Sequence, residues 1–179
     1  MGVISDFKDR LFAKRLRRDT SPARTTTSHP PHPDRAGHLT ILFLADSAED
    51  RKVVDKWRDA HARADRKIRV LGYFEQEVGA TNFDFSVVSV KDLNWYGVPT
   101  GEAVEAFRQE PTDILLRLGP ATHPVLDYLA AIRPATLKVA PYTSAPPPFY
   151  QLLFDGQAQQ QPGKQFLAIQ QIFTHTNAH

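Results

Sequence analysis

Three side chains in the sequence could take part in acid–base or nucleophilic chemistry: Asp46, Asp92 and His123. A carboxylate can act as a nucleophile or hold magnesium, and a histidine can act as a general base near neutral pH. Each of the three follows a hydrophobic segment that predicts a buried strand. Because ligands of open α/β sheets bind beyond the carboxyl ends of the strands, the three would form an enzyme site for a nucleotide or a sugar phosphate if the sheet brings them together.

Two of these residues also have a local explanation. Asp46 stands before Ser47, where a carboxylate commonly accepts hydrogen bonds from nearby backbone, and His123 stands before Pro124, where it could cap a helix. The turn LADSAED at 44–50 lacks both the glycines of a dinucleotide fingerprint and the lysine of a P-loop. Because no catalytic motif is complete, the sequence favours a noncatalytic module over an enzyme.

A second candidate site is the stretch DLNWYGVP at 92–99, which places Asn94, Trp95 and Tyr96 between turn-forming residues. Exposed aromatic residues on a loop would offer a binding platform for a base, a sugar or a protein partner. In the alternative, Trp95 packs over the end of the sheet as a lid, because large aromatic side chains usually bury their rings. The sequence leaves both interpretations open.

Residues 1–19 predict a basic amphipathic helical arm. Ile4, Phe7, Leu11 and Leu16 recur at roughly helical spacing. The other face carries six basic residues: Lys8, Arg10, Lys14, Arg15, Arg17 and Arg18. Either the apolar residues pack on the rest of the protein and the charges are solvated, or the basic face binds an anionic partner, which would be a membrane surface, RNA or an acidic protein. We expect the last four basic residues of the arm to make that contact.

The charge distribution supports a special role for the arm. Residues 1–35 hold eight Lys or Arg against four Asp, a net charge of +4, whereas residues 36–179 hold 14 basic and 16 acidic residues, a net charge of −2. An anionic partner would therefore meet the arm rather than a broad positive face of the remaining chain.

The arm is followed at 20–37 by a segment with four prolines, four threonines and no large apolar residue. Such a segment buries too little surface to offset the entropy of ordering, so we expect a flexible tether. His29 and His32 within it could form a metal-binding pair, but nothing nearby supplies further ligands, and we expect neither a metal site nor a cofactor.

The segment 38–175 predicts a single α/β domain, followed by a disordered tail at 176–179. Apolar and alternating runs indicate strands at 38–45, 67–74, 83–90, 113–118 and 136–140, and a sixth strand or edge segment at 149–154. Helical patterns separate most of these runs, which indicates a three-layer sandwich with a mostly parallel sheet of five to six strands, Rossmann-like or flavodoxin-like. The second and third strands have no helix between them, so we expect that pair to be antiparallel or joined by a loop.

Composition excludes several classes of site. The chain contains no cysteine, which rules out disulfides, thiolate nucleophiles, iron–sulfur clusters and cysteine-based zinc sites. Neither a signal-peptide core nor an apolar run of ~18 residues occurs. We therefore expect a cytoplasmic protein without a transmembrane segment, which the arm could place at the inner membrane surface; its oligomeric state is left open.

Several motifs together resemble a known family: the apolar first strand, DLNWYGVP, TDILLRL, AIRPATLKVAP and FYQLLFD. The chain is similar to a domain of unknown function found in small proteins of Bacteroidota bacteria, typically with a basic N-terminal helix before an α/β body. The resemblance covers about residues 39–155, with the basic arm in front. It implies the fold and a bacterial cytosol and transfers no catalytic residue. The long tether and the PPP loop depart from the family pattern.

The leading hypothesis is a noncatalytic binding or accessory module whose basic arm engages an anionic partner. The alternative is an enzyme that acts on a nucleotide or sugar phosphate at the strand ends.

Overall fold

The computed structural model describes residues 2–21, 31–79, 81–110, 112–155 and 160–176. Most of the predicted tail at 176–179 lies outside these residues, as does the middle of the predicted tether, residues 22–30.

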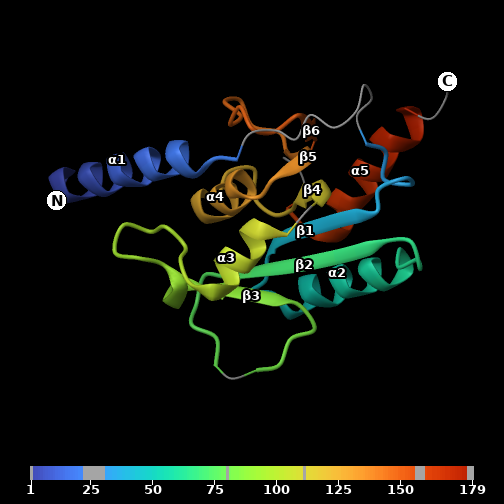
Figure 1. The fold of residues 1–179 in the computed structure, drawn as a ribbon, viewed down its shortest axis with the longest axis horizontal. Helices are drawn as coiled ribbons and strands as arrows, with labels where there is room; N and C mark the ends of the chain where they lie inside the picture. The colour runs from blue at the N-terminus through green and yellow to red at the C-terminus, as the bar shows by residue number, and fades with distance from the viewer. Residues whose placement is uncertain (1, 22–30, 80, 111, 156–159, 177–179) are drawn as a thin grey trace.

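Six strands form one sheet in the order β3-β2-β1-β4-β5-β6, and every neighbouring pair is parallel (Figure 1). The strands are β1 (His38–Leu44), β2 (Lys67–Phe74), β3 (Ser86–Ser89), β4 (Thr112–Arg117), β5 (Ala135–Pro141) and β6 (Leu152–Phe154). The predicted α/β class is confirmed, and the predicted mostly parallel sheet is entirely parallel. Because the strand order reverses between β1 and β4, the ligand crevice typical of such sheets would lie at the carboxyl ends of these two strands.

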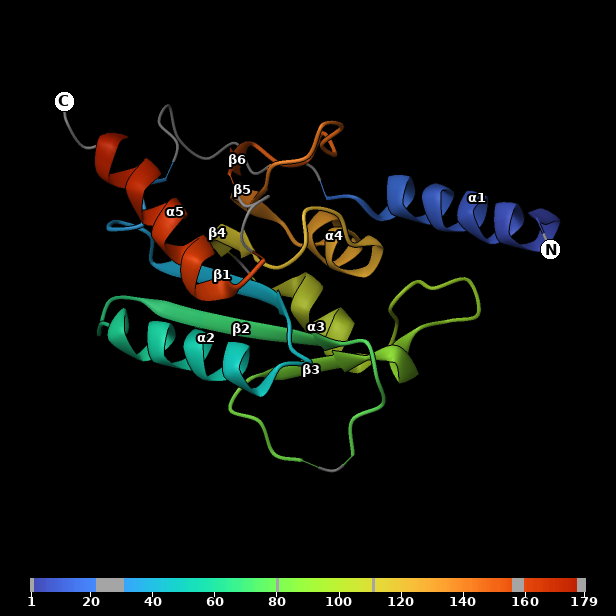
Figure 2. The ribbon, with the colours of Figure 1, turned by 180° about the vertical axis from the view of Figure 1, so that it is seen from behind.

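Helices cover both faces of the sheet, which gives the three predicted layers (Figures 1 and 2). The helices are α1 (Gly2–Asp19), α2 (Ala48–Ala60), the single 3-10 turn η1 (Val90–Asp92), α3 (Glu102–Gln109), α4 (Pro124–Ile132) and α5 (Pro162–Thr176). Side chains of α2 and α5 belong to the core on one face, and side chains of α3 and α4 belong to the core on the other. Helix α1 lies outside these layers, against α4.

The position of β1 inside the sheet explains why its residues 41–44 are an unbroken apolar run. Ile41 and Phe43 contribute to the core beneath α2 and α5, whereas Leu42 contributes to the core beneath α3 and α4. All three side chains are fully buried. A strand covered on both faces needs apolar residues at successive positions, as the sequence predicted.

The connection between β2 and β3 is a loop without a helix, one of the two predicted alternatives, but the start of β3 differs from the prediction. The third strand begins at Ser86 rather than at residue 83, and it is parallel to β2. Phe83 and Phe85 lie in the preceding loop, where they pack on the core beneath α2 and α5. No helix connects β2 to β3, and aromatic rings of the connecting loop pack on the core instead, so the alternation of Phe83 and Phe85 comes from packing rather than from strand pairing.

Gly72 in β2 makes room for this loop. A Cβ atom at Gly72 would lie 2.6 Å from Cε2 of Phe85 and 2.8 Å from Cβ of Ala45. Carbon atoms do not approach so closely, so only glycine fits while the Phe85 ring packs against the strand.

A buried polar network holds the loop between β5 and β6. Tyr150 in this loop donates a hydrogen bond of 2.7 Å to Oδ1 of Asp127 in α4. The same oxygen lies 3.3 Å from the guanidinium of Arg117, whose side chain is fully buried. Burial and the nearby Asp127 charge raise the pKa of Tyr150 well above 10. The phenol therefore stays protonated and keeps donating its hydrogen bond to Asp127.

Both described ends of the predicted tether contact the domain. Ser21 donates from its Oγ to the carbonyl oxygen of Ile132 at 2.7 Å. At the other end, the ring of His32 meets the ring of Phe173 edge to face at 5.5 Å, and Ala36 is buried. The flexibility of the residues between these two ends stays a prediction.

Candidate functional site

The sheet brings two of the three predicted catalytic residues to one edge. Asp46 follows β1 and His123 precedes α4, and both contact Glu75, which follows β2. Oδ2 of Asp46 accepts a hydrogen bond from the backbone N–H of Glu75 at 3.1 Å. Nε2 of His123 lies 3.2 Å from Oε1 of Glu75. Glu75 is therefore the residue that joins them, and its contact with His123 depends on the order of the strands in the sheet.

Both ring nitrogens of His123 are engaged. Nδ1 accepts a hydrogen bond of 3.2 Å from the backbone N–H of Leu126 and so caps α4. With Nδ1 as the acceptor, Nε2 carries the proton and donates a hydrogen bond to Glu75. A general base needs an unoccupied ring nitrogen that faces its substrate, so this arrangement favours the helix-capping interpretation of His123.

Tyr73 completes the strand-end cluster. Its ring meets the His123 ring edge to face with the centroids 5.4 Å apart. Burial, together with the charges of Glu75 and Asp46, raises the pKa of Tyr73 to about 12. The phenol is therefore neutral near pH 7 and cannot act there as an anionic base or nucleophile.

Asp92 serves a local structural purpose. Its Oδ2 accepts hydrogen bonds from the backbone N–H of Ser89 at 2.7 Å and from the Ser89 hydroxyl at 3.2 Å. The bond from the Ser89 N–H is part of a capping box at the start of η1. The Asp92 carboxylate thus fixes the turn after β3 and does not join Asp46 and His123.

The crevice at the end of β1 offers few free donors to a phosphate. Arg51 donates to the carbonyl oxygens of Ala45 at 2.5 Å and Asp46 at 2.9 Å. The first turn of α2 carries Glu49 and Asp50, whose negative charges oppose an anion at that helix end.

The backbone groups of the turn after β4 are also already hydrogen-bonded, so they are not available to a phosphate. The N–H of Gly119 donates to Oε1 of Gln165 at 2.7 Å, and Nε2 of Gln165 donates back to the Gly119 carbonyl at 2.8 Å. A phosphate at the switch point would thus meet paired backbone groups and carboxylates, which does not favour a nucleotide or sugar phosphate as the ligand.

The aromatic loop is organised by Asn94. Oδ1 of Asn94 accepts hydrogen bonds from the N–H groups of Tyr96 at 3.2 Å and Val98 at 3.0 Å. Gly97 adopts a positive φ of 86°, which lets the chain reverse. Tyr96 packs partly on the core beneath α3 and α4, whereas Trp95 at the tip is 61% exposed. Trp95 is therefore not a lid on the sheet.

The arm forms the predicted helix, and its carboxyl-terminal half is docked. Phe12 and Leu16 pack against the core beneath α3 and α4, and the ring of Phe12 lies 5.9 Å from that of Tyr128 in α4. Tyr128 donates its hydroxyl hydrogen to Oδ2 of Asp19 at 2.6 Å, in a buried position.

Two of the four basic residues expected to bind a partner are paired within α1. Arg15 and Arg18 both form ion pairs with Asp19. Lys14 and Arg17 are exposed, and within the described part of the chain neither forms an ion pair with a carboxylate. Lys14 and Arg17 are thus the more available charges for an external anion.

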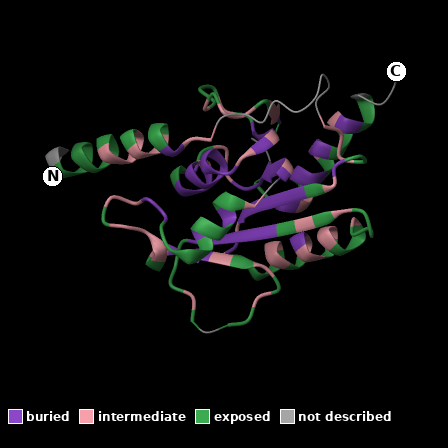
Figure 3. Cartoon of the chain, in the orientation of Figure 1, coloured by how far each residue is buried: buried purple, intermediate pink, exposed green. Residues whose placement is uncertain are grey.

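The amino-terminal half of α1 projects away from the domain (Figure 3). Its residues Ile4 and Phe7 are 72% and 55% exposed. The Phe7 ring stacks on Trp95 with the centroids 6.2 Å apart. Ile4, Phe7 and Trp95 thus form one exposed surface, which we call the apolar tip.

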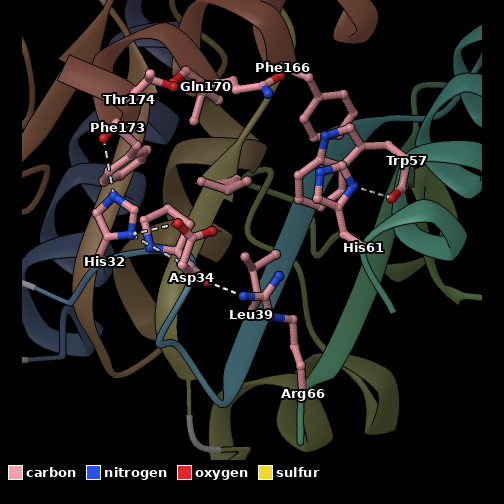
Figure 4. A pocket seen from close by; sticks show the side chains of 13 residues that line it. His32, Asp34, Leu39, Trp57, His61, Arg66, Phe166, Gln170, Phe173 and Thr174 are labelled. Carbon is pink, nitrogen blue, oxygen red and sulfur yellow. Dashed lines mark hydrogen bonds and ion pairs between the residues drawn. The ribbon is translucent and has the colours of Figure 1, made fainter. Parts of the chain in front are cut away.

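A pocket that the sequence did not predict lies between α2 and α5. It encloses about 240 Å³ beside the stacked rings of Trp57 and Phe166, and we call it the α2–α5 pocket (Figure 4). The helical spacing of Trp57 and His61 was visible in the sequence, but their meeting with α5 depends on the tertiary fold.

Within the described residues, no group of three His, Cys, Asp or Glu side chains could hold a metal ion. Across the same residues, no helix combines the length and apolar character needed to cross a bilayer.

Comparison with known proteins identifies the family. A family model described as "Family of unknown function (DUF6913)" matches residues 8–167, which is most of the chain. No curated protein matches the chain significantly. The chain therefore belongs to DUF6913, and the predicted membership in a family of unknown function is confirmed; the Bacteroidota origin stays a prediction.

Proposed function

We propose that this member of DUF6913 is a noncatalytic binding module that docks on an anionic membrane surface, at the inner face of the cell membrane, through α1 and Trp95. The observation that carries the proposal is the apolar tip at the free end of a basic helix. Of the five large hydrophobic residues that are exposed in the described chain, three belong to this tip.

The charge of α1 suits such a surface. Its residues include six Lys or Arg and three Asp, which leaves a net charge of +3, and one of these acids, Asp19, is buried. Each basic residue near an anionic bilayer contributes about 1 kcal/mol of attraction. Lys14 and Arg17, which lack carboxylate partners in the described chain, are the strongest candidates for lipid headgroup contacts.

The docking of α1 on α4 gives the tip a defined direction. Phe12 and Leu16 occupy the side of the helix that faces the domain, so Ile4 and Phe7 cannot use the same surface to bury themselves. Tryptophan and phenylalanine favour the boundary between headgroups and acyl chains. The tip and the basic residues could therefore meet one bilayer together.

An exposed isoleucine distinguishes a bilayer from RNA as the partner. Nucleic acid would bind the cations of α1 and stack its bases on Trp95 and Phe7, but it offers no apolar phase for Ile4. A bilayer attracts the charges and also offers an apolar phase to all three residues of the apolar tip.

Co-sedimentation with vesicles tests the proposal. The protein should bind vesicles of phosphatidylcholine mixed with phosphatidylglycerol, bind phosphatidylcholine alone poorly, and lose affinity as salt rises. The double variant Lys14→Gln/Arg17→Gln should bind roughly thirtyfold more weakly, because two contributions of about 1 kcal/mol are removed. The matched control Lys52→Gln/Lys56→Gln removes two exposed charges from α2 and should bind as well as the unaltered protein.

A second pair of variants separates lipid insertion from simple charge attraction. Phe7→Ser should weaken vesicle binding, whereas Leu167→Ser, at an exposed site on α5, should not. The proposal is wrong if the protein ignores anionic vesicles at low salt, or if both charge variants bind equally. Binding to single-stranded RNA with no binding to vesicles would assign the arm to a different partner.

A further inference from the structure

The α2–α5 pocket has apolar walls and a polar edge. The apolar surface comes from Leu39, Trp57, Phe166, Ile169 and Phe173, among others. Its volume of about 240 Å³ equals that of roughly eight water molecules at ~30 Å³ each. A pocket of this size and lining suits the body of a small organic molecule.

A stack of three rings forms one wall. The rings of Trp57 and Phe166 are nearly parallel, with an interplanar angle of 5° and centroids 4.4 Å apart, and His61 stacks on the other face of Trp57 at 3.9 Å. Nδ1 of His61 donates to the Trp57 carbonyl at 2.8 Å, which leaves Nε2 without a hydrogen bond in the described structure. This stack fixes the wall before any ligand arrives.

Arg66 brings a positive charge to the edge of the pocket. In Figure 4 its side chain enters between His32 and Phe173 on one side and Trp57 and Phe166 on the other. The guanidinium donates to the backbone carbonyls of Ala36, at 3.3 Å, and of Pro33, so it is held in place.

That charge has no close counter-ion. Among the described residues, no carboxylate lies within ion-pair distance of Arg66. Asp65 pairs with Arg63 at 3.3 Å, and Asp34 and Asp65 act on Arg66 only as charges beyond ion-pair distance. Burial, and then the repulsion of Arg63, lower the pKa of Arg66, although the charges of Asp34 and Asp65 partly oppose this. A partly buried cation without an ion-pair partner gains from an anion beside it.

We infer that the α2–α5 pocket binds a small apolar carboxylate, with its hydrocarbon body against Trp57 and its carboxylate against Arg66. A single guanidinium with two fixed carbonyl contacts suits one negative charge. A phosphate would carry more charge than one cation neutralises, so the Asp34 carboxylate at the pocket rim would repel it more strongly than it repels a singly charged carboxylate.

This site is independent of the proposed membrane surface. The pocket belongs to the face of the sheet covered by α2 and α5, whereas α1 docks on α4 over the opposite face. A variant that loses vesicle binding should therefore keep carboxylate binding in the pocket, and the reverse should also hold.

Trp57 reports on the pocket directly. The chain has two tryptophans, so in the variant Trp95→Phe the emission comes from Trp57 alone. In that background, phenylacetate should change the emission saturably, while the neutral phenylacetamide and the dianionic phenyl phosphate should bind at least tenfold more weakly, as expected for one charged hydrogen-bonding partner.

Two kinds of variant complete the test. Arg66→Met keeps the apolar stem and should reduce phenylacetate affinity about tenfold or more without changing that for phenylacetamide. If Arg66→Met fails to fold, Gln170→Phe provides the second test, because Gln170 is exposed at the pocket rim and a ring there should block entry. Its neighbour Gln171 is also exposed but does not line the pocket, so Gln171→Phe should bind normally.

Equal affinity for phenylacetate and phenylacetamide would overturn the inference, as would tighter binding of phenyl phosphate. An unchanged Trp57 emission with all three probes would also overturn it, and so would equal binding by the Gln170→Phe and Gln171→Phe variants.

Discussion

Tyr128 donates a hydrogen bond of 2.6 Å to the buried carboxylate of Asp19, and this contact joins the end of α1 to α4. Burial alone would raise the pKa of Asp19, but hydrogen bonds from Tyr128, Arg18 and Arg15 lower it overall. The carboxylate is thus ionised and strongly held. The arm is consequently part of the folded domain at this end, whereas Ile4 and Phe7 near its other end are mostly exposed.

Removing the Tyr128 hydroxyl should loosen the arm. Tyr128→Phe keeps the ring against Phe12 but leaves Asp19 with one donor fewer, so the free energy of unfolding should fall by about 1.5 to 3 kcal/mol. Urea denaturation measures the loss, and amide exchange should quicken throughout α1. Tyr142→Phe, at an exposed tyrosine, is the control and should change neither quantity.

The buried amine of Lys138 should make stability depend on pH. Its Nζ donates to the Ala131 carbonyl at 3.1 Å, and within the described chain it forms no ion pair. Burial lowers its pKa to about 8, below the value of 10.5 for an exposed lysine. The unfolded chain therefore binds more protons between pH 8 and 10.5, so the free energy of unfolding should rise with pH from about 8.

Lys138→Met tests this assignment. It should stabilise the protein at pH 7 by on the order of 2 kcal/mol and remove the rise in stability between pH 8 and 9.5. Measurements should stop below pH 10. In the folded protein the pKa values of Tyr73 and Tyr128 are about 12, against 10 in the unfolded chain. Above pH 10 the free energy of unfolding therefore falls as these tyrosines lose their protons in the unfolded chain, which would mask the effect of Lys138. Lys56→Met, at an exposed position, should retain the rise; a flat profile in the unaltered protein would contradict the assignment.

Gly72 should tolerate no side chain. Gly72→Ala places a methyl group against Phe85 and Ala45, and the overpacking should destabilise the protein by about 1–3 kcal/mol in thermal or chemical denaturation. Gly79→Ala provides the comparison, since a Cβ there meets nothing within 4 Å. Equal stability of the two variants would show that the β2–β3 loop does not pack on the sheet as described.

His123 should behave as a helix cap. His123→Asn can still accept the Leu126 N–H and should keep most of the stability, whereas His123→Ala should lose about 1 kcal/mol. Urea denaturation of both variants measures this difference. If His123→Ala were as stable as the unaltered protein, the ring would be available for another purpose.

Much of the fold could be predicted from local patterns, and most of the site could not. The apolar run of β1 and the helix start at Pro124 follow from residues close in sequence. The apolar residues of the arm could not be assigned in this way, because Leu16, together with Phe12, faces α4, while Ile4 and Phe7 face solvent. That division depends on where α4 lies.

The polar residues show the same limit. Asp92 forms a capping box with Ser89, three residues earlier, so its structural role could be predicted from nearby sequence. The contact of His123 with Glu75 joins residues 48 positions apart, and it follows only from the parallel order of the sheet. The α2–α5 pocket likewise combines segments that are distant in sequence.

Trp95 offers the most direct test of the membrane surface. In the variant Trp57→Phe, the emission of Trp95 should shift to shorter wavelength on addition of phosphatidylglycerol-containing vesicles, and lipids brominated on the acyl chain should quench it. In Trp95→Phe, the emission of Trp57 should show neither effect. Unquenched and unshifted Trp95 emission on vesicles that contain the anionic lipid at low salt would contradict the account.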